Sequence, residues 1–186
     1  MSDPEVSTAK LLLVEYERLK EEQKVRIGFR DNLIYATLAS MAGVIAATLS
    51  GSGNVDLLLL LPPIAFVLGW TYLANDQKVS AIGRYIRCQL QPRLAAVTNT
   101  TDEIFGWEAD HRSDSSRLIR KSSQLAVDLT MFGASGAAAL IIYWLEAAIA
   151  PMLLALSIIE LVVIVLLAVQ IVLAADLKAR CDHSGR

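Results

Sequence analysis

The longest apolar stretches of this chain lack almost all charge, and they contain no Lys or Arg. They cover residues 33–50, 57–74, 125–145 and 152–175. Within them only Asp128 and Glu160 are ionisable acids or bases. Each stretch is long enough to cross a hydrocarbon core about 30 Å thick, at about 1.5 Å of rise per residue. Four such stretches in 186 residues are hard to solvate, which argues against a soluble helical bundle.

Features typical of secreted, disulfide-rich or catalytic proteins are also scarce. The first thirty residues lack a short apolar core before a small-residue cleavage site, so we expect no cleavable signal peptide. Cys88 and Cys181 fall in segments expected to be cytoplasmic, where thiols stay reduced, so we expect neither a disulfide nor a zinc site. The chain has no Ser–His–acid pattern and no phosphate-binding glycine loop. We therefore expect no enzyme activity, no cofactor and no metal site, although "EADHRSD" around His111 gathers acidic side chains.

The charges that are present are segregated along the chain. Charged residues make up 19% of the sequence and hydrophobic residues 54%, with a mean hydropathy of +0.47. Of the seventeen Lys and Arg residues, six precede the first stretch, eight lie between the second and third, and three follow the fourth. The connections "GSGNV" and "EAAIAP" carry none. By the positive-inside rule, both termini and the long central loop are cytoplasmic.

The expected fold is an all-α integral membrane protein with four transmembrane helices. We expect a cytoplasmic N-terminal helix capped by Ser7, two transmembrane hairpins separated by a basic, helical cytoplasmic loop, and a cytoplasmic tail. These parts cover residues 1–32, 33–74, 75–124, 125–175 and 176–186. The proline pair Pro62–Pro63 should kink the second span, because proline lacks the backbone N–H that a helix interior uses.

Small residues recur at four-residue spacing in the first and third spans. "ATLASMAGVIAATL" contains the pairs Ala36/Ser40 and Ala39/Gly43, and "MFGASGAAAL" repeats the pattern. In lipid, small residues let helix backbones approach closely, so the first span is expected to be packed on several sides. Together the two faces exceed what one bundle needs. We expect a homo-oligomer in membrane lipid, most simply a tetramer.

Glu160 lies roughly 12 Å into the fourth span, where a charge costs about 2.5 kcal/mol or more. Three interpretations are open. The acid is structural and hydrogen-bonded to a serine (Ser157, Ser40 or Ser135), it lines a water-filled path or oligomeric ring, or it couples transport to protons. We favour a cation-selective ring, with Gln170 and Ser157 as further pore-lining groups. Asp128 is expected to pair with Arg120 or Lys121 near the cytoplasmic surface.

Five basic residues flank the spans on the cytoplasmic side: Arg84, Arg87, Arg117, Arg120 and Lys121. One interpretation is that they only satisfy the positive-inside rule and contact anionic lipid headgroups. The other is that they converge on a phosphate-bearing ligand, for which the planar arginine side chain is well suited.

The segment "EYERLKEEQKVRIGFRDNLIYATLAS", followed by paired spans and a basic inner loop, resembles small bacterial membrane effectors of anti-phage defence loci. These are SLATT-type and four-helix effectors encoded beside nucleotidyltransferases, the Hailong-type channel among them. The resemblance covers about the first seventy residues and the overall plan. It implies an oligomeric pore in the bacterial inner membrane, gated by a nucleotide or oligonucleotide, with a nucleotidyltransferase encoded nearby.

This chain departs from the two-span versions by its second hairpin. The alternative function is a non-conducting membrane anchor or scaffold that recruits a cytoplasmic partner through its helices.

Overall fold

The computed structural model describes residues 7–50, 54–99, 117–147 and 150–175, and these segments are almost entirely helical. The elements are α1 (Thr8–Leu49), the 3₁₀ turn η1 (Val55–Leu60), α2 (Leu61–Tyr85), the π segment η2 (Ile86–Leu90), α3 (Gln91–Thr98), α5 (Arg117–Asp128), the π segment η3 (Leu129–Ala134), α6 (Ser135–Glu146) and α7 (Pro151–Ala174). Four helical stretches are long and apolar enough to cross a membrane. The expected all-α class and the four long apolar helices are confirmed.

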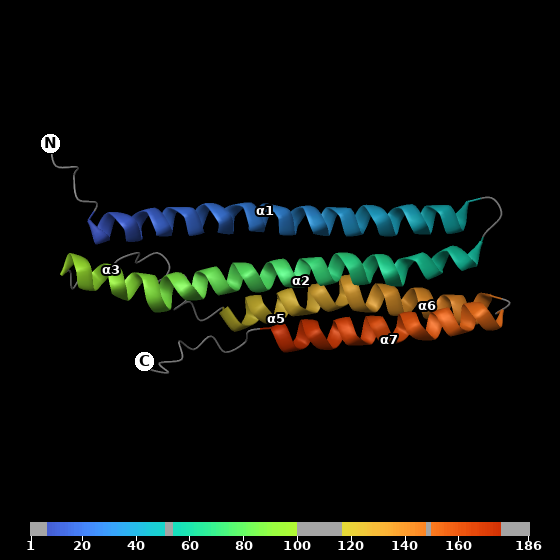
Figure 1. Ribbon diagram of the computed structural model, residues 1–186. Helices are drawn as coiled ribbons and strands as arrows, with labels where there is room; N and C mark the ends of the chain where they lie inside the picture. The colour runs from blue at the N-terminus through green and yellow to red at the C-terminus, as the bar shows by residue number, and fades with distance from the viewer. Residues whose placement is uncertain (1–6, 51–53, 100–116, 148–149, 176–186) are drawn as a thin grey trace.

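The helices lie side by side along one common direction (Figure 1). α2 is central, because it packs against α1 on one side and against α6 and α7 on the other. At one end, α1 and the continuous α2–η2–α3 rod extend beyond the second hairpin. We call residues 8–30 and 76–98 the polar extension. The opposite end, where α1 leads to η1 and α6 leads to α7, is the distal end.

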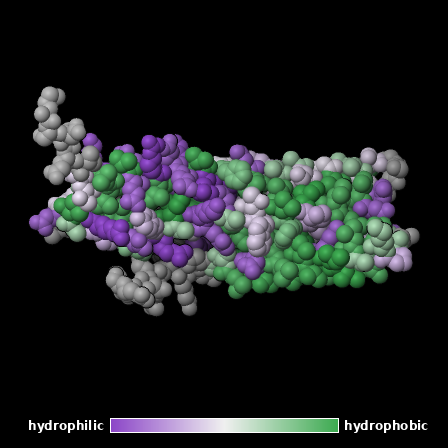
Figure 2. All heavy atoms as spheres, viewed as in Figure 1, coloured by the Kyte–Doolittle hydropathy of each residue, from purple (hydrophilic) through white to green (hydrophobic). Residues whose placement is uncertain are grey.

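Hydropathy divides the molecule along its length. Hydrophilic residues gather over the polar extension and hydrophobic residues cover the four-helix part (Figure 2). α1 crosses this boundary without a break, since its 42 residues form a rod about 63 Å long, twice the thickness of a hydrocarbon core. The expected N-terminal helix and first span are therefore one helix. Its N-cap is Ser7, as expected, which accepts a hydrogen bond from the Lys10 backbone N–H at 3.3 Å.

The proline pair, which we expected to kink the second span, lies at the start of an α-helix and not in a helix interior. Pro62 and Pro63 lie in the first turn of α2, directly after the 3₁₀ turn η1. First-turn N–H groups have no acceptor within their own α-helix, so prolines there remove little. The pair instead marks where the chain changes from 3₁₀ to α-helical geometry.

Glycines allow the helices of the second hairpin to approach α2 and each other. A Cβ at Gly69 of α2 would lie 2.9 Å from Leu167 Cδ2 and 2.9 Å from Phe132 Cγ. A Cβ at Gly136 of α6 would lie 2.9 Å from Ile164 Cδ1. The small residues of the third span therefore do serve close packing.

The first span differs from this expectation. Only 11% of the apolar window of α1 is buried, against 44% for the rod that contains α2. A Cβ at Gly43 would have no neighbour within 4 Å, and Ala36 and Ala39 are exposed. The expectation that this helix is packed on several sides is wrong for the single protomer, because α1 contacts mainly the rod beside it.

Candidate functional site

Polar side chains gather where the four-helix part meets the polar extension. We call this group the junction cluster: Arg30, Tyr72, Asp76, Lys121, Gln124 and Asp128. Arg30 comes from α1, two residues come from α2 and three from α5. The Arg30 Nη1 donates a hydrogen bond to Asp76 Oδ1 at 3.0 Å, which ties α1 to α2. The Gln124 Nε2 donates to Tyr72 Oη at 3.4 Å, which ties α5 to α2.

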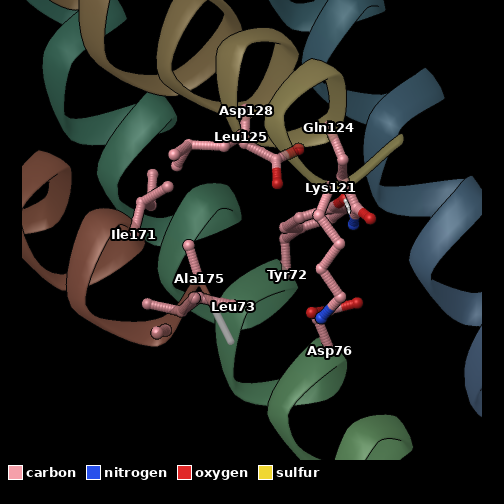
Figure 3. A pocket seen from close by; sticks show the side chains of 10 residues that line it. Tyr72, Leu73, Asp76, Lys121, Gln124, Leu125, Asp128, Ile171 and Ala175 are labelled. Carbon is pink, nitrogen blue, oxygen red and sulfur yellow. Dashed lines mark hydrogen bonds between the residues drawn. The ribbon is translucent and has the colours of Figure 1, made fainter. Parts of the chain in front are cut away.

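A small cavity of about 40 Å³ opens within this cluster (Figure 3). It has room for water, since one water molecule needs roughly 10–15 Å³ of such volume. Lys121 extends toward Asp76 across the cavity, and Asp128 lies on the α5 side with Leu125. Two carboxylates thus face one ammonium and one guanidinium group. This balance of charge favours a structural link between helices over an anion-binding site.

Glu160 is buried on the face of α7 that points into the protomer. Its Oε2 has no hydrogen-bond partner among the described residues. The nearby Ser157 hydroxyl donates to the Leu154 carbonyl at 2.9 Å and accepts from Trp144 Nε1 at 2.9 Å.

One of the three open interpretations, a hydrogen bond between Glu160 and a serine, finds no such bond among the described residues. All three candidate serines donate to backbone carbonyls of their own helices: Ser157 to Leu154, Ser40 to Ala36, and Ser135 to Met131. A serine hydroxyl in a helix reaches the carbonyl three or four residues earlier, and here that local bond takes its only proton.

The three residues expected to line a pore do not share one face of α7. Ser157 and Glu160 are buried together with Ile164 and Leu167, whereas Gln170 is exposed. In this protomer the carboxylate therefore faces the neighbouring helices of its own chain. The pore-lining role of these residues stays a prediction.

The residues expected to bind a phosphate ligand are spread along the molecule. Arg84 and Arg87 follow Asp76 by 8 and 11 residues, which places them about 12 and 16 Å farther along the rod. Lys121 instead lines the cavity beside Asp76. Arg120 is exposed, and the side chain of Arg117 lies outside the described residues. Their role as a ligand site stays a prediction.

Two expectations fall partly or wholly outside the described residues. The segment around His111 is one of them; within the described ranges no group of three or more His, Cys, Asp and Glu residues could hold a metal ion. The cysteines are the other. Cys88 is disulfide-bonded in the structure, so the expectation of a reduced thiol is wrong for this residue. Cys181, the only other cysteine of the chain, is not among the described residues.

The sequence analysis did not identify the aromatic and acidic side chains that the structure places near Glu160's helix and in the junction cluster. Tyr143 and Trp144 belong to the third apolar stretch, where aromatic residues ordinarily mark a membrane interface. Tyr72 lies at the end of the second stretch, and Asp76 lies just after it. Helical spacing gives the face of one helix, but it does not say which faces of two helices meet.

Comparison of the chain with protein-family models, with curated proteins and with solved structures found no match. The resemblance to SLATT-type and Hailong-type effectors stays a prediction.

Proposed function

We propose that this protein is a homo-oligomeric channel or pore-forming effector of the bacterial inner membrane, with both termini and the polar extension in the cytoplasm. The observation that supports it best is Glu160, a buried acid in the most apolar of the four long helices, whose Oε2 is unpartnered in the described part of the chain. Ionisable groups inside membrane helices are costly, and they usually mark ion or proton pathways. The basic residues of the polar extension support the orientation.

Oligomerisation is supported by the free face of α1. Gly43, Ala36 and Ala39 form a surface that the protomer itself leaves exposed. Small residues of this kind allow close contact between helices in lipid. A second copy of the chain presents the same surface, so α1 can pack against another copy of the protein. The simplest such assembly that we propose is a tetramer.

Gating from the cytoplasm is supported by the continuity of the helices. α1 runs from the polar extension into the four-helix part without interruption, and the α2–η2–α3 rod does the same. A ligand that moves the extension would therefore move the first two spans. We propose a nucleotide or oligonucleotide as that ligand, with Arg84 and Arg87 contacting its phosphates. This choice follows the resemblance, which also suggests a nucleotidyltransferase encoded nearby.

A second candidate function is a non-conducting anchor or scaffold that holds a cytoplasmic partner. It is favoured by the apolar core between Glu160 and the junction cluster. Phe132 and Leu167 are completely buried there, and Ile164 nearly so. Within the described residues, one protomer in this conformation thus offers no continuous polar path. Conduction requires either a rearrangement or a path between protomers.

Conductance of the purified protein in planar bilayers, with and without candidate nucleotides, separates the two functions. A channel gives discrete current steps that depend on the nucleotide. Glu160→Gln should keep folding and assembly but shift cation over anion selectivity, whereas Glu160→Leu should suppress the current. Leu166→Val, at an exposed position of the same helix, is the matched control and should conduct like the parent. Absence of current under every condition, with intact assembly, would favour the anchor.

A further inference from the structure

The polar extension carries large apolar side chains that its own protomer leaves exposed. On α1 they include Leu11, Val14, Val25 and Phe29, each of which is between 46% and 67% exposed. Single apolar residues on a surface are normal, whereas a line of them along one helix marks an interaction site. These four belong to the hydrophilic part of the molecule (Figure 2), so a protein surface and not hydrocarbon is expected to cover them.

The same face of α1 continues into the four-helix part. Asn32, Ala36, Ala39 and Gly43 follow Phe29 at steps of three or four residues, and all are exposed. Such steps keep side chains on one side of a helix, and α1 has no break from Thr8 to Leu49. We call this line the α1 stripe: Leu11, Val14, Arg18, Glu21, Val25, Phe29, Asn32, Ala36, Ala39 and Gly43.

A groove of about 530 Å³ lies beside the cytoplasmic half of the stripe. The Asn75 Nδ2 of α2 donates to the Arg26 carbonyl of α1 at 2.6 Å, which holds the two helices together at the groove. Side chains of another helix therefore have room to pack against both α1 and α2. The groove is lined by Arg18, Glu21, Glu22, Val25, Arg26, Phe29 and Asn75.

The charges that line this groove balance one another. Arg18 Nη1 lies 3.2 Å from Glu21 Oε2, and Arg26 Nη2 lies 2.6 Å from Glu22 Oε1. Two guanidinium groups and two carboxylates have no net charge, so they do not favour a nucleic acid or an anionic headgroup. Ion pairs within one exposed helix contribute only about 0.3–0.5 kcal/mol, so they exchange partners at little cost. A surface that carries the same two pairs is therefore complementary to this one.

We propose that the α1 stripe is the interface between two parallel copies of this chain, from Leu11 in the polar extension to Gly43 in the membrane. Copies inserted in the same orientation present their apolar residues and their small residues at the same two heights. A soluble partner would cover only the half in the extension, and lipid would cover only the half in the span. A second copy covers both.

The groove gives this contact its order along the helix. Arg18 of one copy lies one helical turn from the height of Glu22 on the other, which is within reach of these long side chains. Val25 and Phe29 pack in the neighbouring groove, and the small residues then let the helix backbones approach in lipid. The inference deepens the proposed function and rests on it for the oligomer and for insertion in the membrane.

Site-specific crosslinking tests the stripe at both heights. In the full chain with Cys88→Ser and Cys181→Ser, single cysteines are placed by Val25→Cys or Gly43→Cys, and native membranes are treated with copper phenanthroline, a lipid-permeant oxidant. Both positions should give a covalent dimer. The matched controls Ile27→Cys and Ile45→Cys are exposed but lie two residues later, about 200° around the helix, and should stay monomeric on denaturing gels.

Charge reversal tests whether the pairs form between copies. Arg18→Glu and Glu22→Arg should each weaken the Val25→Cys crosslink about tenfold. Chains that carry one change each, coexpressed with tags of different size, should crosslink to each other like the parent, because an acidic groove then meets a basic one. Glu17→Arg makes the same change of charge at an exposed position outside the groove and should have no effect.

Light scattering of the same chains in nanodiscs keeps two failures apart. An oligomer that lacks the dimer at Val25→Cys, at Gly43→Cys or at both overturns the α1 stripe and keeps the proposed oligomer. A monomer refutes the proposed oligomer together with the stripe. Control positions that crosslink as strongly as the stripe, an adduct of Val25→Cys with a different protein, or coexpressed charge variants that fail to crosslink would also overturn the stripe.

Discussion

The Trp144 Nε1 lies 2.9 Å from Ser157 Oγ, and this hydrogen bond joins α6 to α7 across the distal end of the second hairpin. It satisfies the only polar atom of the indole. The same serine also donates to the Leu154 carbonyl, so its donor and one acceptor position are both used. The hairpin is therefore fixed one turn away from Glu160, on the side of the distal end.

Ser157→Ala should leave the Trp144 N–H without its partner and destabilise the second hairpin by about 1–3 kcal/mol. The expected result is a lower thermal unfolding midpoint in detergent and a shifted Trp144 emission maximum. Ser135→Ala is the matched control, because the Ser135 hydroxyl bonds only a carbonyl of its own helical segment. Equal effects of the two substitutions would contradict a specific link between α6 and α7.

Gly69→Ala should destabilise the protomer by about 1–3 kcal/mol, because its Cβ would overlap Leu167 and Phe132 at 2.9 Å. The loss should appear in unfolding of the purified protein by a denaturing detergent. Phe132→Leu in the same chain should restore part of the stability by making room. If Gly69→Ala unfolds like the parent, the contact of α2 with η3 and α7 is not as tight as the structure has it.

Gly43→Ile tests the free face of α1. The substitution meets nothing within the protomer, so the stability of the single chain should hardly change. If α1 mediates contact between copies, the larger side chain should shift the mass measured by light scattering in nanodiscs or mild detergent from oligomer to monomer. Val67→Ile, at an exposed position of α2, is the control. A parent protein that is monomeric under the same conditions would refute oligomerisation altogether.

The polar extension should loosen at high pH. The Tyr85 hydroxyl donates to Glu15 Oε1 at 2.6 Å, and this hydrogen bond raises the pKa of Tyr85 above its ordinary value of 10.0. A raised pKa means that the stability from this bond is complete below about pH 10 and is lost as the pH rises through the folded-state pKa. Spin labels on α1 and α2 should report this separation, and Tyr85→Phe should remove the pH step. A step of equal size in Tyr85→Phe would assign it to another group.

Membrane topology and the state of Cys88 are tested together. In a chain with Cys88→Ser and Cys181→Ser, single cysteines at Ser52 and Ala148 should react with an impermeant maleimide added outside intact cells. Labelling from the cytoplasmic side would reverse the proposed orientation.

Structural disulfides are rare in the cytoplasm, so the bond at Cys88 is unusual for the side that the proposed topology gives it. Mass spectrometry of the alkylated native chain shows whether that bond persists in the cell.

The sequence was sufficient to predict the long apolar helices, since length and hydropathy alone distinguish them from the rest of the chain. It was less informative about how they pack. The small residues around Gly43 and those around Gly136 share the same spacing, yet only Gly136 lies against a neighbouring helix of its own protomer. Spacing shows that a helix can be approached closely and does not identify the partner. The start of an α-helix at the proline pair was not predicted for a related reason, because a 3₁₀ turn ahead of α2 leaves no signal that hydropathy detects.

The candidate sites were predictable only in part. Glu160 stands out in the sequence as a carboxyl group within an apolar helix, and the structure shows that it is buried. The unpartnered hydroxyl of Tyr143 on α6 could not be identified from the sequence, because an aromatic residue near the end of an apolar helix has an ordinary function at a membrane boundary. Arg30 and Asp76 are 46 residues apart, and their ion pair depends on the register between α1 and α2.

The central place of α2 has a consequence for biosynthesis. α1 packs mainly on the segment that follows it in the chain, so the first hairpin can close before the second hairpin has been translated. The second hairpin then docks on the opposite side of α2, where Gly69 leaves room for the side chains of Phe132 and Leu167. Folding can thus proceed in two steps, with α2 as the template for both. A lesion in α2 should therefore disrupt the whole molecule, whereas one on the free face of α1 should spare the assembly of the single chain.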